Sequence, residues 1–279
     1  MDIPKLVFKG SKPGPRLLVL GAIHGNETAG PAAIRRLAAE LEARKIVLTA
    51  GELTMVPVCN QKAYRQNTRY VDENLNRVFR KHSDPTSYEQ RCANRLTDFF
   101  AGADYVLDLH SQHVDGQSYC FAQNNSRKLL DFVRALGPEC IIFDWAKLYP
   151  EGDFTTESYA ESLGAVGTTV ECGNHTNPKT VDVAYDTILR ALVHLGMIPS
   201  ESVSKPNLEA LNLYMTKKYD FQAGGRLAKA WQHLDYLPAG AVVATLEDGT
   251  EIKAAEDSYM ILPKLTDNRP GEEWFYLAV

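Results

Sequence analysis

The chain lacks long apolar segments and clusters of basic residues. The first absence argues against a membrane-spanning protein and the second against a nucleic-acid-binding one. None of its hydrophobic runs approaches the roughly 18 residues of a membrane-spanning helix, so no membrane partner is expected. Its 30 basic residues are outnumbered by 35 acidic ones, which argues against nonspecific binding to nucleic acid. The N-terminal residues also lack the basic start and apolar core of a signal peptide, so we expect a cytoplasmic protein.

Cysteine is scarce and irregularly placed. The five cysteines are odd in number, widely spread and without a C-x-x-C pair. This usage indicates free thiols in a reducing cytoplasm, most of them small buried residues. The sequence further lacks the G-x-G-x-x-G spacing and the lysine of phosphate-binding loops, which argues against a nucleotide-binding role.

The sequence does contain a regular alternation of apolar strands and amphipathic helices up to about residue 198. Residues 16–23 are apolar throughout, as expected of a strand buried on both faces, and the residues after Pro31 have helical spacing. Further strands are predicted over residues 51–60, 103–111 and 164–175. The alternation predicts an α/β fold whose mostly parallel or mixed central sheet is flanked by helices.

The character of the chain changes in its C-terminal part. Residues 205–279 contain short β-type runs separated by turn signals, which predict a small β-rich C-terminal domain. The sequence "LEDGTEI" is typical of a hairpin turn. We therefore expect two domains, a catalytic one over residues 1–200 and the small β-rich one over residues 205–279.

Three of the predicted strands end in residues that bind metals or move protons. His24 and Glu27 lie in the glycine-rich stretch "GAIHGNETAG", His110 ends "YVLDLHS", and Glu171 ends "VGTTVE". Parallel α/β sheets bind ligands at the carboxyl ends of their strands, so we expect these side chains to converge. The H-x-x-E spacing alone is equally typical of residues that cap a helix. Two histidines and a carboxylate, however, are a common ligand set for catalytic zinc.

A second segment offers groups for binding a substrate. Residues 66–79, "QNTRYVDENLNRVF", contain Arg69, Asn76 and Arg77. Arginine presents a planar fork that matches a carboxylate, and a neighbouring asparagine and arginine can hold one carboxylate from two sides. The alternative is that these are ordinary surface residues.

Taken together, these motifs resemble the aspartoacylase and succinylglutamate desuccinylase family of the zinc carboxypeptidase-like superfamily. The resemblance rests on "GAIHGNETAG", "TRYVDENLNRVF", "YVLDLHS" and "VGTTVECG", in the family's order, and covers roughly residues 16–175. It implies one zinc ion per chain, held by His24, Glu27 and His110. It also leaves room for a homo-oligomer.

The same resemblance implies roles for the remaining residues. Glu171 would act as general base and acid, and Arg69 would polarise the scissile carbonyl. Asn76 and Arg77 would bind the free carboxylate of the substrate. A tyrosine from the C-terminal domain is also expected at the site, and the candidates are Tyr236, Tyr259 and Tyr276.

The sequence departs from the family at two positions. Asn74 stands where aspartoacylases often have an aspartate. Aspartoacylases also place an arginine, which meets the second carboxylate of the substrate, shortly before the catalytic glutamate. Glu157 fills that position here, so a distal carboxylate would be repelled and N-acetylaspartate should be a poor substrate. The group facing Glu157 would be basic or polar; alternatively, the acidic residues of this segment form a solvated helix face.

The sequence therefore predicts a zinc-dependent hydrolase of carbon–nitrogen bonds in linear amides, a deacylase of small N-acyl amino acids. One alternative is a zinc carboxypeptidase that acts on short peptides, and another is a non-catalytic metal-binding relative. His113 and His175 are weaker candidates for the site.

Overall fold

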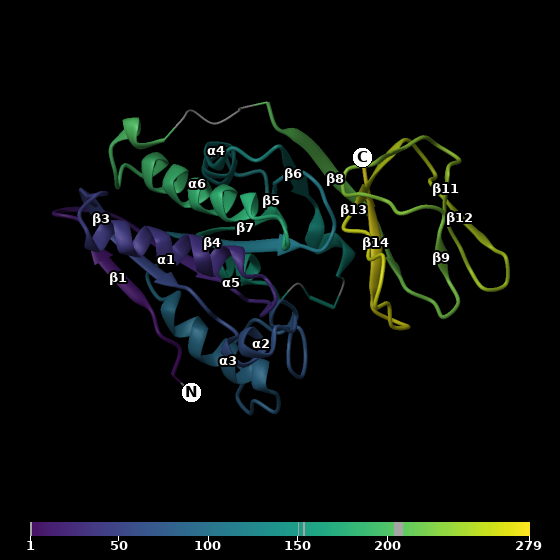
Figure 1. Cartoon of the computed structure of the whole chain (residues 1–279), viewed down its shortest axis with the longest axis horizontal. Helices are drawn as coiled ribbons and strands as arrows, with labels where there is room; N and C mark the ends of the chain where they lie inside the picture. Colours follow the sequence, from purple (N-terminus) through teal and green to yellow (C-terminus); the bar gives the residue numbers. More distant parts are fainter. Residues whose placement is uncertain (1, 150, 153, 204–208) are drawn as a thin grey trace.

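One large mixed sheet organises the fold (Figure 1). The computed structural model describes residues 2–149, 151–152, 154–203 and 209–279, and within these residues eleven strands form this sheet and three form a small separate one. The large sheet has the order β1 (Leu6–Lys9), β3 (Ala50–Val56), β2 (Lys12–Gly21), β4 (Tyr105–Gln112), β7 (Val166–Asn174), β5 (Tyr119–Ala122), β6 (Cys140–Phe143), β8 (Leu211–Asp220), β14 (Glu273–Ala278), β13 (Ser258–Ile261) and β10 (Tyr236–Leu237). The small sheet has the order β12 (Glu251–Lys253), β11 (Val242–Thr245) and β9 (Arg226–Leu227).

Parallel pairing dominates the centre of the large sheet. Strands β3, β2, β4 and β7 run parallel to one another, and β5 runs antiparallel to β7. This arrangement confirms the predicted α/β class with a mixed central sheet. The strand predicted over residues 16–23 begins earlier, at Lys12, and ends at Gly21.

Helices cover both faces of the sheet. They are α1 (Ala29–Glu42), α2 (Gln61–Gln66), α3 (Tyr88–Leu96), α4 (Arg127–Leu136), α5 (Thr156–Ser162) and α6 (Lys179–His194), with short 3₁₀ turns η1 (Leu75–Arg77), η2 (Thr97–Phe99), η3 (Trp145–Leu148) and η4 (Ser200–Ser202). One core lies between the sheet and α1, α4 and α6, and a second lies between the sheet and α3 and α5. None of the helices in the described residues is long and apolar enough to cross a membrane.

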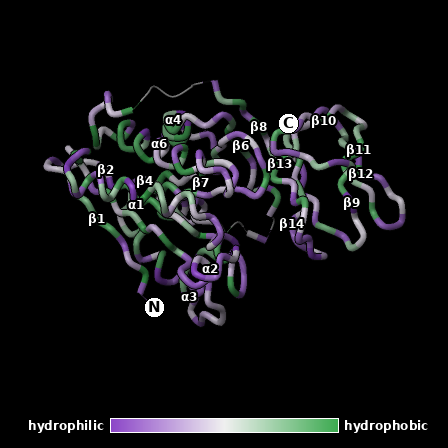
Figure 2. The backbone as a smooth tube through the Cα atoms, viewed as in Figure 1, coloured by the Kyte–Doolittle hydropathy of each residue, from purple (hydrophilic) through white to green (hydrophobic). Residues whose placement is uncertain are grey.

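Alternation along each strand decides which core a side chain enters. In β4, Leu107 and Leu109 pack under α1, α4 and α6, whereas Val106 packs under α3 and α5. Apolar stretches run along these central strands in Figure 2. The five cysteine side chains are also buried, as predicted.

The C-terminal part of the chain is β-rich, as predicted, and it extends the large sheet. Strand β8 pairs with β6 on one side and with β14 on the other. The predicted hairpin is confirmed, because β11 and β12 pair antiparallel and the N–H of Leu246 donates to the carbonyl of Thr250 over 2.8 Å. The predicted start of a second domain at residue 205 falls within residues 204–208, outside the described residues. The division into two domains stays a prediction.

The continuous sheet generates a test of domain independence. A chain ending at residue 203 would leave the edge of β6 without its partner and would uncover Tyr119, Phe121 and Ile142, which pack against Leu213. We therefore expect residues 1–203 expressed alone to aggregate or to unfold at a Tm at least about 10 °C below that of the full chain. A truncated chain that is monomeric and melts like the full protein would contradict this expectation.

Candidate functional site

The residues predicted to form the site converge at the carboxyl ends of β2, β4 and β7. His110 and Glu171 are direct register partners on the adjacent strands β4 and β7, so their side chains lie on the same face of the sheet. That face is the one covered by α3 and α5, because His110 follows Leu109, which packs on the opposite side. His24 and Glu27 reach the same place from the loop that follows β2.

The loop after β2 turns sharply and packs tightly against α2. Ala22 has a φ of 48°, a left-handed conformation that is strained for a residue with a side chain. At Gly25, a Cβ would lie 2.1 Å from the carbonyl carbon of Ala63. The missing side chain of Gly25 therefore permits the close approach that brings His24 and Glu27 over β4.

Three of these side chains form a compact buried group. The ligand atoms of His24, Glu27 and His110 all lie within 4.8 Å of one another. Oε1 of Glu27 lies 2.8 Å from Nδ1 of His24, and Oε2 of Glu27 lies 3.0 Å from Nδ1 of His110. Each residue is 2% exposed. The donor set of two imidazoles and one carboxylate fits a zinc ion with one position left open.

The far nitrogens of both rings are held by protein oxygens. Nε2 of His24 lies 2.9 Å from Oδ1 of Asn74, an oxygen that also accepts the backbone N–H of Asn76, so the ring is the donor. Nε2 of His110 lies 2.9 Å from Oδ2 of Asp108. Both Nδ1 atoms therefore face Glu27. Burial opposes the charge of His110, but Asp108 and Glu27 raise its pKa well above the usual value, so a metal ion would displace a proton from Nδ1 of this ring.

The charges within this group also fit a cation. Burial, with a smaller effect of Arg69, lowers the pKa of His24 to about 4, so its ring is neutral near pH 7. Burial opposes the ionisation of Glu27, but the facing His24 and His110 hold its pKa well below the usual value. The lone pair on Nδ1 of His24 therefore faces an ionised carboxylate. A cation between them would turn this repulsion into two attractive contacts.

Glu171 and Arg69 both lie beside the three-residue group. Arg69 donates from Nη1 to Oε1 of Glu27 over 3.0 Å, and its side chain remains 43% exposed. Oε2 of Glu171 is buried and has no hydrogen-bond partner among the described residues. Burial, followed by the negative charge of Glu27, raises the pKa of Glu171 to about 8. A carboxyl with a raised pKa is suited to accepting and returning a proton near neutral pH.

Arg77 is already paired with a carboxylate of the protein. Its Nε and Nη2 donate to Oε1 of Glu273 on β14 over 2.9 and 2.8 Å. The hydroxyl of Tyr149 donates to the same oxygen over 2.7 Å and lies 2.7 Å from the hydroxyl of Tyr276. We call these four residues the Arg77 cluster. Burial opposes the ionisation of Glu273, but Arg77 lowers its pKa to about 2.

The Arg77 cluster contains residues that the sequence analysis missed. Nothing local marks Glu273 or Tyr149, since each becomes recognisable only when β14 and the segment after η3 pack on Arg77. Tyr276 is the one of the three predicted tyrosines that reaches the cluster. Tyr236 is 53% exposed and contacts Tyr259 instead.

Asn76 and Glu157, the other predicted substrate-binding residues, contact helix α5 and its neighbours. Oδ1 of Asn76 accepts the backbone N–H of Thr156 over 3.0 Å. Glu157 is 3% exposed, and its Oε2 accepts a hydrogen bond from Thr169 over 2.6 Å. The hydroxyl of Thr156 lies 3.3 Å from the same oxygen and donates to Asp108 over 2.6 Å. Glu157 therefore lies inside the protein, behind the three-residue group.

The alternative interpretation of the acidic residues between 151 and 161 is a solvated helix face. This interpretation is wrong for Glu157, which is buried, but it fits the exposed acidic residues on either side. Glu151 and Glu161 are exposed, and Glu161 accepts a hydrogen bond from Asn124. Asp153 lies outside the described residues. Of the described acidic residues in this segment, Glu157 is therefore in the interior, and Glu151 and Glu161 are on the surface.

The two weaker histidine candidates lie near the site but outside the ligand group. Nε2 of His113 lies 3.0 Å from the carbonyl oxygen of Pro263. Nδ1 of His175 lies 2.9 Å from the hydroxyl of Ser111, whose N–H donates to Oε2 of Glu27 over 3.1 Å. Only His175 is therefore connected to the three-residue group, through Ser111.

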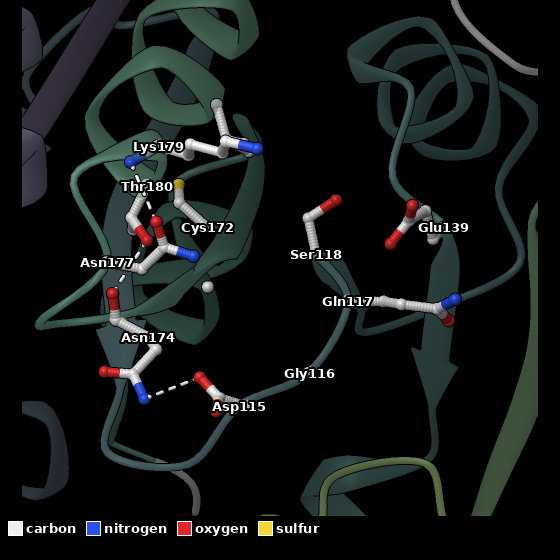
Figure 3. A pocket seen from close by; sticks show the side chains of 12 residues that line it. Asp115, Gly116, Gln117, Ser118, Glu139, Cys172, Asn174, Asn177, Lys179 and Thr180 are labelled. Carbon is white, nitrogen blue, oxygen red and sulfur yellow. Dashed lines mark hydrogen bonds between the residues drawn. The ribbon is translucent and has the colours of Figure 1, made fainter.

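A cavity of about 450 Å³ opens on the other side of β7 (Figure 3). Cys172 borders it together with Lys179 and Thr180 at the start of α6. Cys172 alternates with Glu171 along the strand, so the two side chains lie on opposite faces of the sheet. This cavity is therefore separate from the candidate site.

Comparison with known proteins connects this arrangement to one family. A family model described as the succinylglutamate desuccinylase/aspartoacylase catalytic domain matches residues 13–195. A product-bound structure of the ectoine utilization protein EutE (DoeB) from Ruegeria pomeroyi has a TM-score of 0.80 and 23% identity, and the match covers 99% of this chain and 88% of that one. At this identity the likeness shows a shared fold.

Two curated relatives have named activities. The N-alpha-acetyl-L-2,4-diaminobutyric acid deacetylase of Halomonas elongata is 28% identical over 214 residues, which cover 71% of this chain and 60% of the relative. This chain therefore spans less than two thirds of that relative's length. The succinylglutamate desuccinylase of a Shewanella species is 27% identical over 284 aligned positions, which cover 92% of this chain and 80% of the relative.

The contact between Asn74 and His24 predicts how metal affinity can be tuned. Replacing Asn74 by aspartate would place a carboxylate on Nε2 of His24 and make the ring a more basic ligand. We expect N74D to bind zinc about 10-fold more tightly than the wild type, and N74A about 10-fold more weakly, in competition with a chelator. Equal zinc affinities for the three proteins would contradict a supporting role for Asn74.

The pair formed by Arg77 and Glu273 predicts a pH-dependent contribution to stability. The pKa of Glu273 is lowered from 4.5 to about 2, so its contribution is complete above pH 4.5 and is lost as the pH falls towards 2. We expect E273Q to be less stable than the wild type by about 2 kcal/mol at pH 7, because the charge of Arg77 loses its partner. Urea unfolding at pH 7, 4.5, 3 and 2 should show this difference shrinking on acidification; a constant difference would show that the charge of Glu273 is irrelevant.

Proposed function

We infer, because the chain belongs to the succinylglutamate desuccinylase/aspartoacylase family, that it hydrolyses the amide bond of an N-acyl amino acid. The named relatives are a deacetylase and a desuccinylase, which supports this class of reaction. The observation that carries the proposal is the grouping of His24, Glu27 and His110 beside Glu171 on the adjacent strand. Such a combination of a metal-ligand group and a proton acceptor is suited to metal-assisted hydrolysis of an unactivated amide.

We propose that His24, Glu27 and His110 hold one zinc ion through two Nδ1 atoms and a carboxylate. Bound zinc would supply a Lewis acid and would lower the pKa of water at the site towards neutrality. The oxygens of Asn74 and Asp108 keep the two rings oriented for this role.

Glu171 is the proposed proton carrier. A bound cation would offset the negative charge of Glu27, which contributes to the raised pKa of Glu171, and would favour its ionised form. Its buried Oε2, which has no hydrogen-bond partner among the described residues, could then accept a proton from the attacking water and return it to the leaving nitrogen. Arg69 is half exposed beside Glu27, so its guanidinium can donate to the oxygen of the scissile carbonyl as negative charge develops there. Glu171 would thereby transfer the proton, and Arg69 would stabilise the negative charge on the carbonyl oxygen.

Asn76 and Arg77 are proposed to bind the carboxylate on the amino acid half of the substrate. Oδ1 of Asn76 is engaged with Thr156, so its amide nitrogen is the group left to donate. Arg77 is shared with Glu273, whose charge neutralises it. A substrate carboxylate therefore meets a weaker positive field than an unpaired arginine would create.

This charge balance favours amino acids with a basic or polar side chain over aspartate. Glu157 adds negative charge behind the ligand group, and Glu273 cancels Arg77. The diaminobutyric acid in one relative's name is a basic amino acid, which agrees with this preference. Contacts of Glu272 with Tyr70 and of Pro263 with His113 join the C-terminal part to segments near the ligand group, which supports a preference for short substrates over peptides.

A deacylation screen tests the proposal directly. The zinc-loaded protein should hydrolyse N-acetyl derivatives of basic amino acids, such as 2,4-diaminobutyric acid, faster than N-acetylaspartate. E171Q should bind zinc at the wild-type ratio but lose about 100- to 10,000-fold in kcat, because the proton acceptor is gone. Release of free amine measures the rate, and metal analysis measures the zinc.

E161Q provides the matched control. It makes the same chemical change at an exposed glutamate, which accepts a hydrogen bond from Asn124 and does not contact the ligand group. This variant should retain full activity. Full activity in E171Q would remove Glu171 from the mechanism. Faster cleavage of peptides than of N-acetyl amino acids would favour a carboxypeptidase.

A further inference from the structure

Three polar side chains follow one another along β4 on the face that holds the candidate site. Asp108, His110 and Gln112 occupy alternate positions of this strand. Asp108 and His110 are in contact over 2.9 Å, and Gln112 contacts Tyr119, the register partner of Glu171, so all three lie on this face. At the Asp108 end, Thr156 connects this column to Asn76. Gln112 therefore lies at the opposite end, beyond His110.

A row of side chains crosses the sheet at the level of His110. His110 pairs in register with Glu171, and Glu171 pairs with Tyr119 of β5. The hydroxyl of Tyr119 donates to Oε1 of Gln112 over 3.3 Å, and the ring of His233 stacks on Tyr119 with centroids 4.1 Å apart. Gln112, Tyr119 and His233 thus form one layer next to Glu171.

Three buried polar atoms around Tyr119 have no hydrogen-bond partner among the described residues. They are Nε2 of Gln112, Nε2 of His233 and Oε2 of Glu171. Gln112 is 2% exposed and His233 is 4% exposed. Buried donors without partners are rare, because nothing replaces the hydrogen bonds they lost from water. Two such donors in one layer indicate a place where a ligand supplies the acceptor.

His233 is held as a neutral donor between two strained residues. Burial lowers the pKa of His233 to about 3, so its ring is uncharged near pH 7. Nδ1 accepts the backbone N–H of Leu262 over 3.4 Å, which leaves the proton on Nε2. Leu234 and Leu262 have φ values of 67° and 49°, a left-handed conformation that is strained for leucine.

Gly116 packs closely against both residues. A Cβ at this position would lie 3.0 Å from Nε2 of Gln112 and 3.0 Å from Cβ of His233, which is tighter than an ordinary contact. The missing side chain of Gly116 therefore lets one backbone segment touch both Gln112 and His233, so the two side chains are neighbours.

We propose that Gln112 and His233 form a second subsite, which binds a neutral acceptor oxygen of the acyl group, such as a hydroxyl or a carbonyl. The assignment rests on the proposed function. It assigns the acyl half because Asn76, at the other end of the column, is proposed to hold the amino acid half. Both donors are uncharged, so a distal carboxylate would find no cation there to compensate its burial.

Matched substrates test this subsite. The α-N-acetyl, α-N-glycolyl and α-N-succinyl forms of 2,4-diaminobutyric acid differ only in the acyl group. We expect the kcat/KM of the glycolyl form to exceed that of the acetyl form by about 10-fold or more, since its hydroxyl pairs with the two donors. H233F and Q112M should each reduce this ratio about 10-fold, and the succinyl form should not be preferred.

Thermal unfolding provides a measurement that does not depend on activity. Because Oε1 of Gln112 accepts from Tyr119, the comparison uses Y119F, in which that hydrogen bond is already absent: if Nε2 of Gln112 lacks a partner, adding Q112M to Y119F should raise Tm by about 2–4 °C. H194F, which alters an exposed histidine of α6, should change neither Tm by this amount nor the substrate ratio.

Two results would overturn the subsite. A fall in Tm from Y119F to Y119F/Q112M would show that Nε2 of Gln112 has a structural partner, and an unchanged glycolyl-to-acetyl ratio would show that the two donors do not contact the acyl group. If the wild type hydrolyses none of the three compounds, the proposed function fails instead, and the Tm comparison still decides whether Nε2 of Gln112 is unpaired.

Discussion

The arrangement of the site depends on the burial of one carboxylate, that of Glu27. An ionised carboxylate with 2% exposure is unstable unless several donors or cations surround it. The ring of His24 contacts it from the same loop, and its other partners come from distant parts of the chain: the ring of His110, the guanidinium of Arg69 and the N–H of Ser111. The loop after β2, the strand β4 and the segment 66–79 must therefore all be in place before Glu27 can be buried.

The same requirement extends outward from the ligand group in one connected network. Asp108 holds the ring of His110 and accepts the hydroxyl of Thr156, whose N–H donates to Asn76. Asn76 precedes Arg77, which forms an ion pair with Glu273, the first residue of β14. A chain of hydrogen bonds and one ion pair thus leads from the ligand group to the C-terminal part. A structural change in β14 can therefore reach the site without touching the ligands.

The sequence predicted which polar residues end the buried strands, but it did not predict which side chains they contact. The first property is local in the sequence, whereas the second depends on how distant segments pack. Apolar runs such as 16–23 define buried strands, and polar residues at their ends are visible as local exceptions, so His24, His110 and Glu171 stood out. Glu273 and His233 belong to a segment whose short strands have no strong pattern, and their meaning depends on which neighbours they pack against. The burial of Glu157 was missed because α5 has seven residues, too few for its inward face to be identified.

The pairing of charged side chains around the candidate site bears on which substrate charges it would accept. The positive charge of Arg77, the expected partner of a substrate carboxylate, is neutralised within the protein, and Glu157 and Asp108 add negative charge behind the ligand group. Arg69 is the cation at the site that retains substantial exposure. A doubly anionic acyl amino acid would leave one carboxylate without a strong positive partner, whereas a side-chain ammonium would be attracted by the surrounding acids. Under the proposed function, discrimination between substrates would therefore depend on how the protein pairs its own charges as well as on a binding arginine.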